Sequence, residues 1–240
     1  MLPAALRAIY PARCMACGEP ADREHALCGP CWRDTPFIVG LVCDLCGTSL
    51  PGQGENSEGL ACDECLRVAR PWHKGRAALQ YRDNARRFVL QLKHGDKTEL
   101  ARPLAAWMAA AARSLVTGSV VIVPVPLHRT RLFTRRFNQS ALLAQRMSQS
   151  LGQPACLDAL TRTRRTASLG GLSREDRFRM LDSSIAVTPR RAGQIRGRNI
   201  LLVDDVMTTG ATLAACTEAL IAGGAGKIDV VTLARAAKGD

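Results

Sequence analysis

The sequence predicts an α/β fold, in which a parallel sheet is flanked by helices and preceded by a small cysteine-rich domain. Short apolar runs alternate with amphipathic segments over residues 75–240, the order expected of βαβ units. One such run, Ile200–Val203, leads into two aspartates, a threonine-rich loop and an apolar helix. Eight of the ten cysteines lie before residue 66, in four C-x-x-C pairs. We therefore expect two domains, at residues 1–70 and 75–240, separated by the change in composition at Pro71–Gly75.

The cysteine pairs predict metal binding in the first domain. Two thiolates two residues apart can hold one ion from a single tight turn, and two such turns complete a tetrahedral shell of four sulfurs. Four pairs in a compartment where thiols stay reduced favour two structural zinc sites over redox motifs. We expect two sequential zinc ribbons, with a cross-braced arrangement as the alternative. The expected zinc ligands are Cys14, Cys17, Cys28, Cys31, Cys43, Cys46, Cys62 and Cys65.

The first half of the larger domain is predicted to contain a strand, two helices and a second strand. Ala77–Tyr81 is a short apolar run, and residues 84–93 follow with a helical period. The alanine-rich amphipathic stretch at residues 99–115 predicts the second helix. Residues 120–123 are uninterrupted valine and isoleucine, which is typical of a strand buried on both faces. The inward residues of the first helix are predicted to be Phe88, Val89 and Leu92.

The second half begins with a basic stretch from Arg131 that opens a helix running to about Ser150, with Asn138 as a possible cap. Phe133 and Phe137 in this stretch could stack on bases or pack into the core. Residues 160–173 are polar and cationic, which predicts a loop able to close over a charged substrate. The remaining elements are strands at residues 184–187 and 228–233, which flank the Ile200–Val203 unit, and a helix at residues 213–221 ended by Gly223 and Gly224.

Positive charge is concentrated in one part of the chain. The net charge is +12, and between Arg129 and Arg198 there are fifteen arginines and no lysine, against four acidic residues. Such a band favours phosphate-rich partners such as nucleotides or nucleic acid, although a solubilising surface would have the same composition. No apolar run is long enough to span a bilayer and the N-terminus lacks a signal-peptide pattern, so we expect a cytoplasmic protein.

The stretch from Ile200 to Thr212 predicts a site for a phosphate attached to a polyol. The free N–H groups at a helix N-terminus bind phosphate, and Gly210 lets the backbone come close. The carboxylates of Asp204 and Asp205 can accept hydrogen bonds from vicinal hydroxyls or ligate Mg²⁺. A buried strand that merely ends in solvated aspartates is the alternative. The expected ligand-binding residues are Val206, Met207, Thr208, Thr209, Gly210, Ala211 and Thr212.

This stretch resembles the signature of type I phosphoribosyltransferases, which bind phosphoribosyl pyrophosphate (PRPP). The resemblance implies that Asp204 and Asp205 bind the ribose hydroxyls, that the threonine-rich loop binds the 5′-phosphate, and that Mg²⁺ accompanies PRPP. We interpret the loop after the strand at residues 120–123 as the pyrophosphate side, because an α/β sheet exposes ligand-binding groups at the carboxyl ends of its strands. Lys93 or an arginine of residues 162–165 could add positive charge. The residues expected in the pyrophosphate loop are Pro126, Leu127, His128 and Arg129.

The order of parts resembles the ComF family of competence proteins, including its GntX-type members. That family joins an N-terminal zinc-ribbon region to a phosphoribosyltransferase domain, which implies a role in the uptake or use of external DNA. Besides the cysteine pairs, the resemblance rests on Leu92-Lys93, Val123–His128, Phe137–Gln139, Thr163–Thr166, Leu202–Thr212 and Leu233–Arg235.

Three functions are compatible with these features. The first is a phosphoribosyltransferase that consumes PRPP. The second is a non-catalytic adaptor of the DNA-uptake proteins that binds single-stranded DNA and keeps the PRPP pocket as a sensor or relic. The third, ranked last because a salvage enzyme seldom needs a zinc array, is a purine or pyrimidine salvage enzyme.

Overall fold

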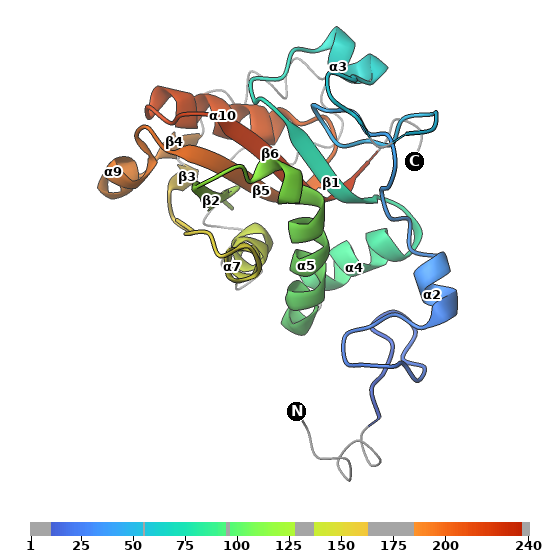
Figure 1. Cartoon of the computed structure of the whole chain (residues 1–240). Helices are drawn as coiled ribbons and strands as arrows, with labels where there is room; N and C mark the ends of the chain where they lie inside the picture. Colours follow the sequence, from blue (N-terminus) through green and yellow to red (C-terminus); the bar gives the residue numbers. More distant parts are fainter. Residues whose placement is uncertain (1–10, 55, 95–96, 128–136, 163–184, 237–240) are drawn as a thin grey trace.

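The computed structural model describes residues 11–54, 56–94, 97–127, 137–162 and 185–236. Its centre is a four-stranded sheet in the order β1-β6-β5-β2, and every neighbouring pair is parallel (Figure 1). This arrangement confirms the predicted α/β fold. The strands are β1 (Gly75–Gln80), β2 (Val120–Pro124), β5 (Asn199–Met207) and β6 (Ile228–Arg235).

Helices cover both faces of the sheet, which is why the central strands are almost wholly apolar. On one face pack α4 (Asp83–His94), α5 (Ala101–Ala112) and α7 (Gln139–Leu151), and on the other packs α10 (Ala211–Ala222). All eight residues of β6 are buried. The predicted inward residues of α4 are confirmed, since Phe88, Val89 and Leu92 have no exposed surface. The 3-10 turns η1 (Thr98–Leu100) and η2 (Arg113–Leu115) extend α5 over the stretch predicted as one helix.

Strand β5 is longer than the apolar run Ile200–Val203, which predicts a strand that ends at the two aspartates. It continues to Met207, because Val206 and Met207 pair with Ala234 and Arg235 of β6. Both aspartates are therefore strand residues. The two carboxylates have different neighbours, since Asp204 accepts a hydrogen bond from Ser140 and Asp205 lies beside Lys93.

A second correction concerns the strand predicted at residues 184–187. It exists as β4 (Ile185–Val187), but it pairs antiparallel with β3 (Leu160–Arg162) in a separate two-stranded sheet. The prediction that residues 160–162 belong to a loop was wrong for the same reason. The short elements η3 (Pro189–Arg191) and α9 (Ala192–Ile195) follow β4 and were not predicted.

The cysteine-rich part packs directly on the sheet. It contains two short helices, α2 (Gly29–Arg33) and α3 (Asp63–Arg67). Gly47 lies so close to β1 that a Cβ atom there would be 2.4 Å from the backbone nitrogen of Ala77. The backbone N–H of Gly75 also donates to the carbonyl oxygen of Asp44 at 2.8 Å. The predicted division at Pro71–Gly75 stays a prediction, and Trp72 within it is buried.

Within the described ranges, no helix has both the length and the apolar character needed to cross a bilayer. Cys156 and Cys216, the two cysteines outside the pairs, are buried among apolar side chains, as small core residues should be.

Candidate functional site

The candidate site lies where β5 ends and α10 begins. Gly210 has a φ angle of +80° and precedes the first residue of α10. Glycine adopts this conformation without steric cost, so the chain can turn sharply into the helix. A cavity of about 100 Å³ lies at this turn. Its lining comprises Asp204, Val206, Met207, Thr208, Thr209, Gly210, Ala211, Thr212 and Leu213.

The structure therefore brings one predicted carboxylate and the whole predicted loop around one cavity. The N-terminus of α10 faces this loop, so the positive end of its dipole favours an anion there. The backbone N–H of Ala211 donates to Oγ1 of Thr209 at 3.4 Å, and other N–H groups of the first turn can meet the anion. Asp205 is not among the residues that line the cavity. We call residues 208–212 the Thr-rich loop.

Asp204 is held by two hydrogen bonds. The hydroxyl of Ser140 donates to its Oδ1 at 2.8 Å, and the backbone N–H of Asp205 donates to the same oxygen at 2.9 Å. Burial, followed by the negative charge of Asp205, raises the pKa of Asp204 to about 7. The two hydrogen bonds and the charge of Lys93 act in the opposite direction. The side chain is thus poised between its charged and neutral forms near neutral pH.

Asp205 faces α4, where Lys93 lies. The Nζ atom of Lys93 is 3.2 Å from Oδ2 of Asp205. Both side chains are largely shielded, with 21% and 13% of their surface exposed. The structure therefore places the predicted Lys93 beside a predicted carboxylate, although α4 and β5 are far apart in sequence.

The expected pyrophosphate loop leaves the sheet next to β5. The backbone N–H of Val125 donates to the carbonyl oxygen of Val203 at 2.9 Å. Asn138 caps α7, as predicted, by accepting from the N–H of Ser140, and its Nδ2 donates to the carbonyl oxygen of Val125 at 3.0 Å. Pro126 is buried and Leu127 half-buried, and neither lines the 100 Å³ cavity.

Several predicted features lie outside the described residues. They are His128, Arg129, Phe133, the opening of the α7 helix before residue 137, and the part of the substrate-closing loop from residue 163 onward.

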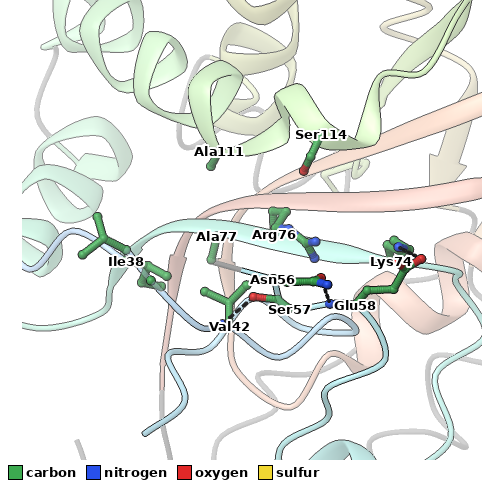
Figure 2. Close-up of a pocket in the computed structure, with 12 residues that line it drawn as sticks. Ile38, Val42, Asn56, Ser57, Glu58, Lys74, Arg76, Ala77, Ala111 and Ser114 are labelled. Atoms are coloured by element: carbon green, nitrogen blue, oxygen red, sulfur yellow. Dashed lines mark hydrogen bonds and ion pairs between the residues drawn. The ribbon is translucent and has the colours of Figure 1, made fainter. Parts of the chain in front are cut away.

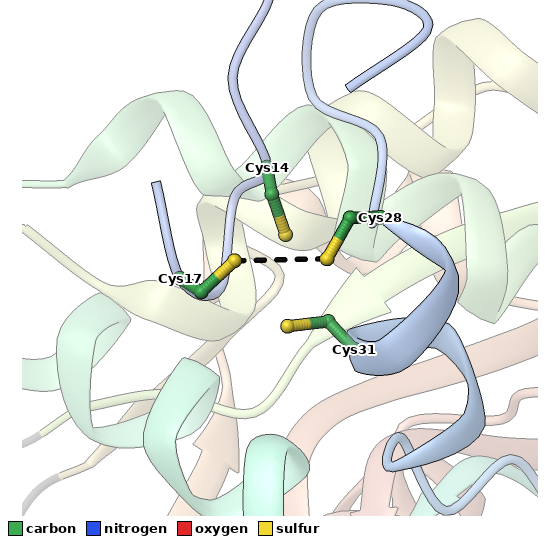
Figure 3. A group of neighbouring side chains, drawn as sticks. All are labelled: Cys14, Cys17, Cys28 and Cys31. Atoms are coloured by element: carbon green, nitrogen blue, oxygen red, sulfur yellow. Dashed lines mark hydrogen bonds between the residues drawn. The ribbon is translucent and has the colours of Figure 1, made fainter. Parts of the chain in front are cut away.

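The eight paired cysteines form two groups of four. The first cysteine group is Cys14, Cys17, Cys28 and Cys31, shown in Figure 3, and the second is Cys43, Cys46, Cys62 and Cys65. Within each group the sulfur atoms all lie within 4.8 Å of one another. This grouping confirms sequential rather than cross-braced ligation.

The geometry of both groups fits a tetrahedral zinc ion. Zinc–sulfur bonds of about 2.3 Å place the sulfurs of a tetrahedral site about 3.8 Å apart. The structure gives 3.6 Å between Sγ of Cys17 and Cys28, and 3.7 Å between Sγ of Cys46 and Cys62. The chain therefore has two sites suited to structural zinc.

A larger open cavity of about 450 Å³ lies between residues 38–42, residues 56–58, β1 and the end of α5 (Figure 2). Its cationic side chains, Lys74 and Arg76, both contact the carboxylate of Asp44, at 3.4 and 2.9 Å. Because that carboxylate already neutralises charge there, this cavity is a weaker candidate for an anion than the α10 N-terminus.

The contacts of Ser140, Arg70 and Arg235 were not predicted from the sequence, although Arg235 belongs to the Leu233–Arg235 segment that carries the family resemblance. Arg70 and Arg235 donate hydrogen bonds to carbonyl oxygens of the Thr-rich loop. Each of the three contacts joins segments distant in the chain, so no local pattern could reveal them.

Comparison with known proteins adds an independent line of support. A family model described as a double zinc ribbon domain matches residues 5–66, and one described as a phosphoribosyl transferase domain matches residues 138–240. The chain is 33% identical to the DNA utilization protein YhgH of Escherichia coli strain K12, over 94% of this chain and 97% of that protein. It is 28% identical to competence protein F of Haemophilus influenzae, over 93% and 97%, and 25% identical to competence protein ComFC of Bacillus subtilis, over 88% and 85%.

Proposed function

The chain belongs to the ComF family of phosphoribosyltransferase-domain proteins, and on that premise we propose that it binds PRPP with Mg²⁺ and transfers phosphoribose with release of pyrophosphate. The observation that carries this proposal is the cavity shared by Asp204 and the Thr-rich loop at the N-terminus of α10. We further propose that the activity serves the uptake or use of external DNA, because the relatives are named for DNA utilization and competence.

The 5′-phosphate would bind the Thr-rich loop. The backbone N–H groups at the start of α10 donate to its oxygens, and the hydroxyls of Thr208, Thr209 and Thr212 provide further donors. All three threonines line the cavity. No side-chain bulk at Gly210 obstructs the close approach of the backbone.

The ribose would lie beside Asp204. In its charged form the carboxylate accepts hydrogen bonds from vicinal hydroxyls and favours the positive charge that develops at C1. The hydrogen bond from Ser140 and the N–H of Asp205 help to keep Asp204 charged. Asp205 would act by holding Lys93 near the end of β5.

The proposed transfer exchanges one bond at C1 of the ribose for another. The bond between C1 and the pyrophosphate oxygen breaks, and its electron pair leaves with pyrophosphate. A lone pair of the acceptor forms the new bond to C1, and the acceptor releases a proton. The carboxylate oxygens of Asp204 and Asp205 are the type of ligand that Mg²⁺ prefers, and an ion bound with PRPP would neutralise charge on the leaving group.

The test is pyrophosphate release from PRPP by the zinc-loaded protein, over a panel of bases, nucleotides and single-stranded DNA as acceptors. We expect release by the wild type with one acceptor class, and its loss in the Asp204→Asn/Asp205→Asn double variant. Release that persists in the double variant would contradict the assignment of the site.

The second candidate is the single-stranded-DNA adaptor, and one surface feature favours it. Trp32 is 57% exposed and lines a groove of about 800 Å³, whose other side chains include Trp107, the cations Arg23 and Arg102, and the acids Asp22 and Glu24. An exposed aromatic ring can stack on a base, and nearby cations can contact phosphates. Tight, salt-sensitive DNA binding with no pyrophosphate release under any acceptor would favour this adaptor over the enzyme.

We also propose that the protein works in the cytoplasm. The support is chemical, since both cysteine groups must stay reduced to bind zinc.

A further inference from the structure

Two arginines lie behind the Thr-rich loop, and almost none of their side-chain surface is exposed. Arg70, from the segment after α3, has 1% of its side chain exposed, and Arg235, at the end of β6, has 3%. Nη1 of Arg70 donates to the carbonyl oxygen of Thr209 at 2.7 Å. Nη1 of Arg235 donates to the carbonyl oxygen of Thr208 at 2.7 Å. Two successive peptide groups of the loop are thus held by guanidinium groups.

These contacts also fix the orientation of the N–H groups in the same peptide planes. In a trans peptide the C=O and N–H bonds of one plane point in opposite directions. The carbonyl of Thr208 shares its plane with the N–H of Thr209, and the carbonyl of Thr209 shares its plane with the N–H of Gly210. When the arginines hold the carbonyls from behind, both N–H groups point away from the arginines, on the side where an anion can meet them.

The second cysteine group fixes both arginines. Glu64, between the zinc ligands Cys62 and Cys65, lies 2.6 Å from Nη2 of Arg235 and 3.5 Å from Nη2 of Arg70. Nε of Arg70 also donates to Sγ of Cys65 at 3.4 Å. Buried guanidinium groups need such partners, because an unpaired charge away from water is costly.

Trp72 forms another connection between the same parts. Its Nε1 donates to the carbonyl oxygen of Leu45, between Cys43 and Cys46, at 2.6 Å. The guanidinium carbon of Arg70 lies 5.5 Å from the centre of the Trp72 ring. A Cβ atom at Gly210 would be 3.1 Å from this ring, so the loop packs tightly against it.

We propose that Arg70 and Arg235 are positioning residues that couple the second zinc site to the Thr-rich loop. They orient the N–H groups of Thr209 and Gly210 for phosphate, and the zinc-bound second cysteine group keeps the arginines in place through Glu64 and Cys65. This inference rests on the proposed function, in that it takes the 5′-phosphate of PRPP as the anion. It gives the zinc in the second group a role in ligand affinity.

The first cysteine group has a different attachment. The side chain of Asn84, in α4, donates to the carbonyl oxygen of Cys31 at 3.3 Å. Cys14, Cys28 and Cys31 pack against the core on the α4 and α5 face. Loss of zinc from the first group should therefore leave the Thr-rich loop in place.

The test uses Arg70→Met and Arg235→Met in the full zinc-loaded chain, since methionine keeps much of the side-chain volume without the donors. Arg76→Met is the matched control, because Arg76 joins β1 to Asp44, between Cys43 and Cys46, and within the described residues makes no hydrogen bond or ion pair with the Thr-rich loop. Zinc content and thermal melting are measured for each variant, to show that the fold and both zinc ions are retained.

The first readout needs no ligand. The backbone ¹⁵N order parameters of Thr209 and Gly210 should be close to about 0.85 in the wild type and in Arg76→Met, and should fall below about 0.6 in Arg70→Met and Arg235→Met. The second readout is PRPP affinity with Mg²⁺, which should fall roughly tenfold or more in the two loop variants, the size expected for loss of a hydrogen bond from a charged donor.

Unchanged order parameters in both loop variants would overturn the inference, as would an equal loss of order in Arg76→Met. If either methionine variant fails to fold, Arg70→Lys and Arg235→Lys keep the charge beside Glu64 and remove the guanidinium fork, and the same loss of order is expected. Absence of PRPP binding by the wild type would refute the proposed function alone, because the order parameters still decide whether the arginines position the loop.

Discussion

The hydroxyl of Ser140 donates a 2.8 Å hydrogen bond to Oδ1 of Asp204. This contact joins the first turn of α7 to the end of β5 and lowers a pKa that burial and Asp205 raise. Ser140 thereby favours the charged form of the Asp204 carboxylate, against burial and the charge of Asp205. The charge of Asp204 can be tested through this neighbour without altering the carboxylate itself.

Ser140→Ala should raise the pKa of Asp204, because the hydrogen bond that favours the charged form is lost. PRPP affinity, which needs that form, should then reach its half-maximum at a pH higher by roughly one to two units. The measurement is PRPP affinity between about pH 5.5 and about pH 9, a range that includes the pKa expected for Asp204 in both proteins. Ser148→Ala is the control, since Ser148 lies in the same helix and donates to Gln153 instead. An unchanged or lower midpoint in Ser140→Ala would contradict the role of Ser140.

Asp204→Asn should make the protein more stable at alkaline pH. The pKa of Asp204 rises from 3.8 to about 7 on folding, so the folded state binds the proton more tightly than the unfolded state. The resulting stability is fully present below the unfolded pKa of 3.8 and is lost as pH rises through about 7. We expect the variant to gain up to a few kcal/mol over the wild type at pH 8, which is about one unit above the folded pKa.

That difference is measured by urea unfolding of wild type and variant at the same pH values, so that titration of the zinc ligands affects both equally. The difference in the free energy of unfolding should grow from about pH 5 to about pH 8. A difference that is constant over this range would show that Asp204 has an ordinary pKa in the folded protein.

The local parts of the site could be predicted from sequence, because neighbouring residues build them. Ile200–Thr212 contains the strand, the turn and the helix start in order, so the Thr-rich loop and its cavity follow from one pattern. The cysteine pairs are equally local, since each offers two ligands from one turn. The structure confirms that the four pairs form two groups in sequential order.

The hydrogen bonds that hold the site in place could not be predicted, because they join residues far apart in the sequence. Ser140 is 64 residues from Asp204, and Arg70 is 139 residues from Thr209. The end of β5 was misjudged for a related reason. Aspartate disfavours strands locally, but pairing with Ala234 and Arg235 of β6 extends the strand past both carboxylates.

Gly210→Ala should destabilise the protein and weaken PRPP binding. An alanine at the φ of +80° found there is strained by roughly 1–2 kcal/mol. Its Cβ would also be 2.8 Å from Nη1 of Arg70, which displaces the guanidinium from the loop. Gly152→Ala separates the two effects, since Gly152 has a φ of +63° with open space around it.

Thermal melting and PRPP calorimetry on both glycine variants give the comparison. Gly152→Ala should lower stability by the backbone strain alone and leave PRPP affinity intact. Equal PRPP affinities in the two variants would rule out the close packing of Arg70 against the loop.

Each cysteine group should bind one zinc ion independently of the other. The wild type should contain two zinc ions per chain by elemental analysis, and Cys17→Ser or Cys62→Ser should each contain one. Loss of an ion should strongly destabilise the affected region, because a structural zinc contributes on the order of 10 kcal/mol to folding. Cys156→Ala, a buried cysteine outside both groups, should keep two. A wild type with a single zinc ion would contradict the assignment.

PRPP should bind at the junction of β5 and α10. Isothermal titration calorimetry of the zinc-loaded wild type and of Asp204→Asn, each with PRPP and Mg²⁺, measures this binding. We expect saturable binding of one PRPP per chain by the wild type, and strongly reduced binding by the variant. No binding by folded wild-type protein that contains both zinc ions, or equal binding by the two proteins, would contradict it.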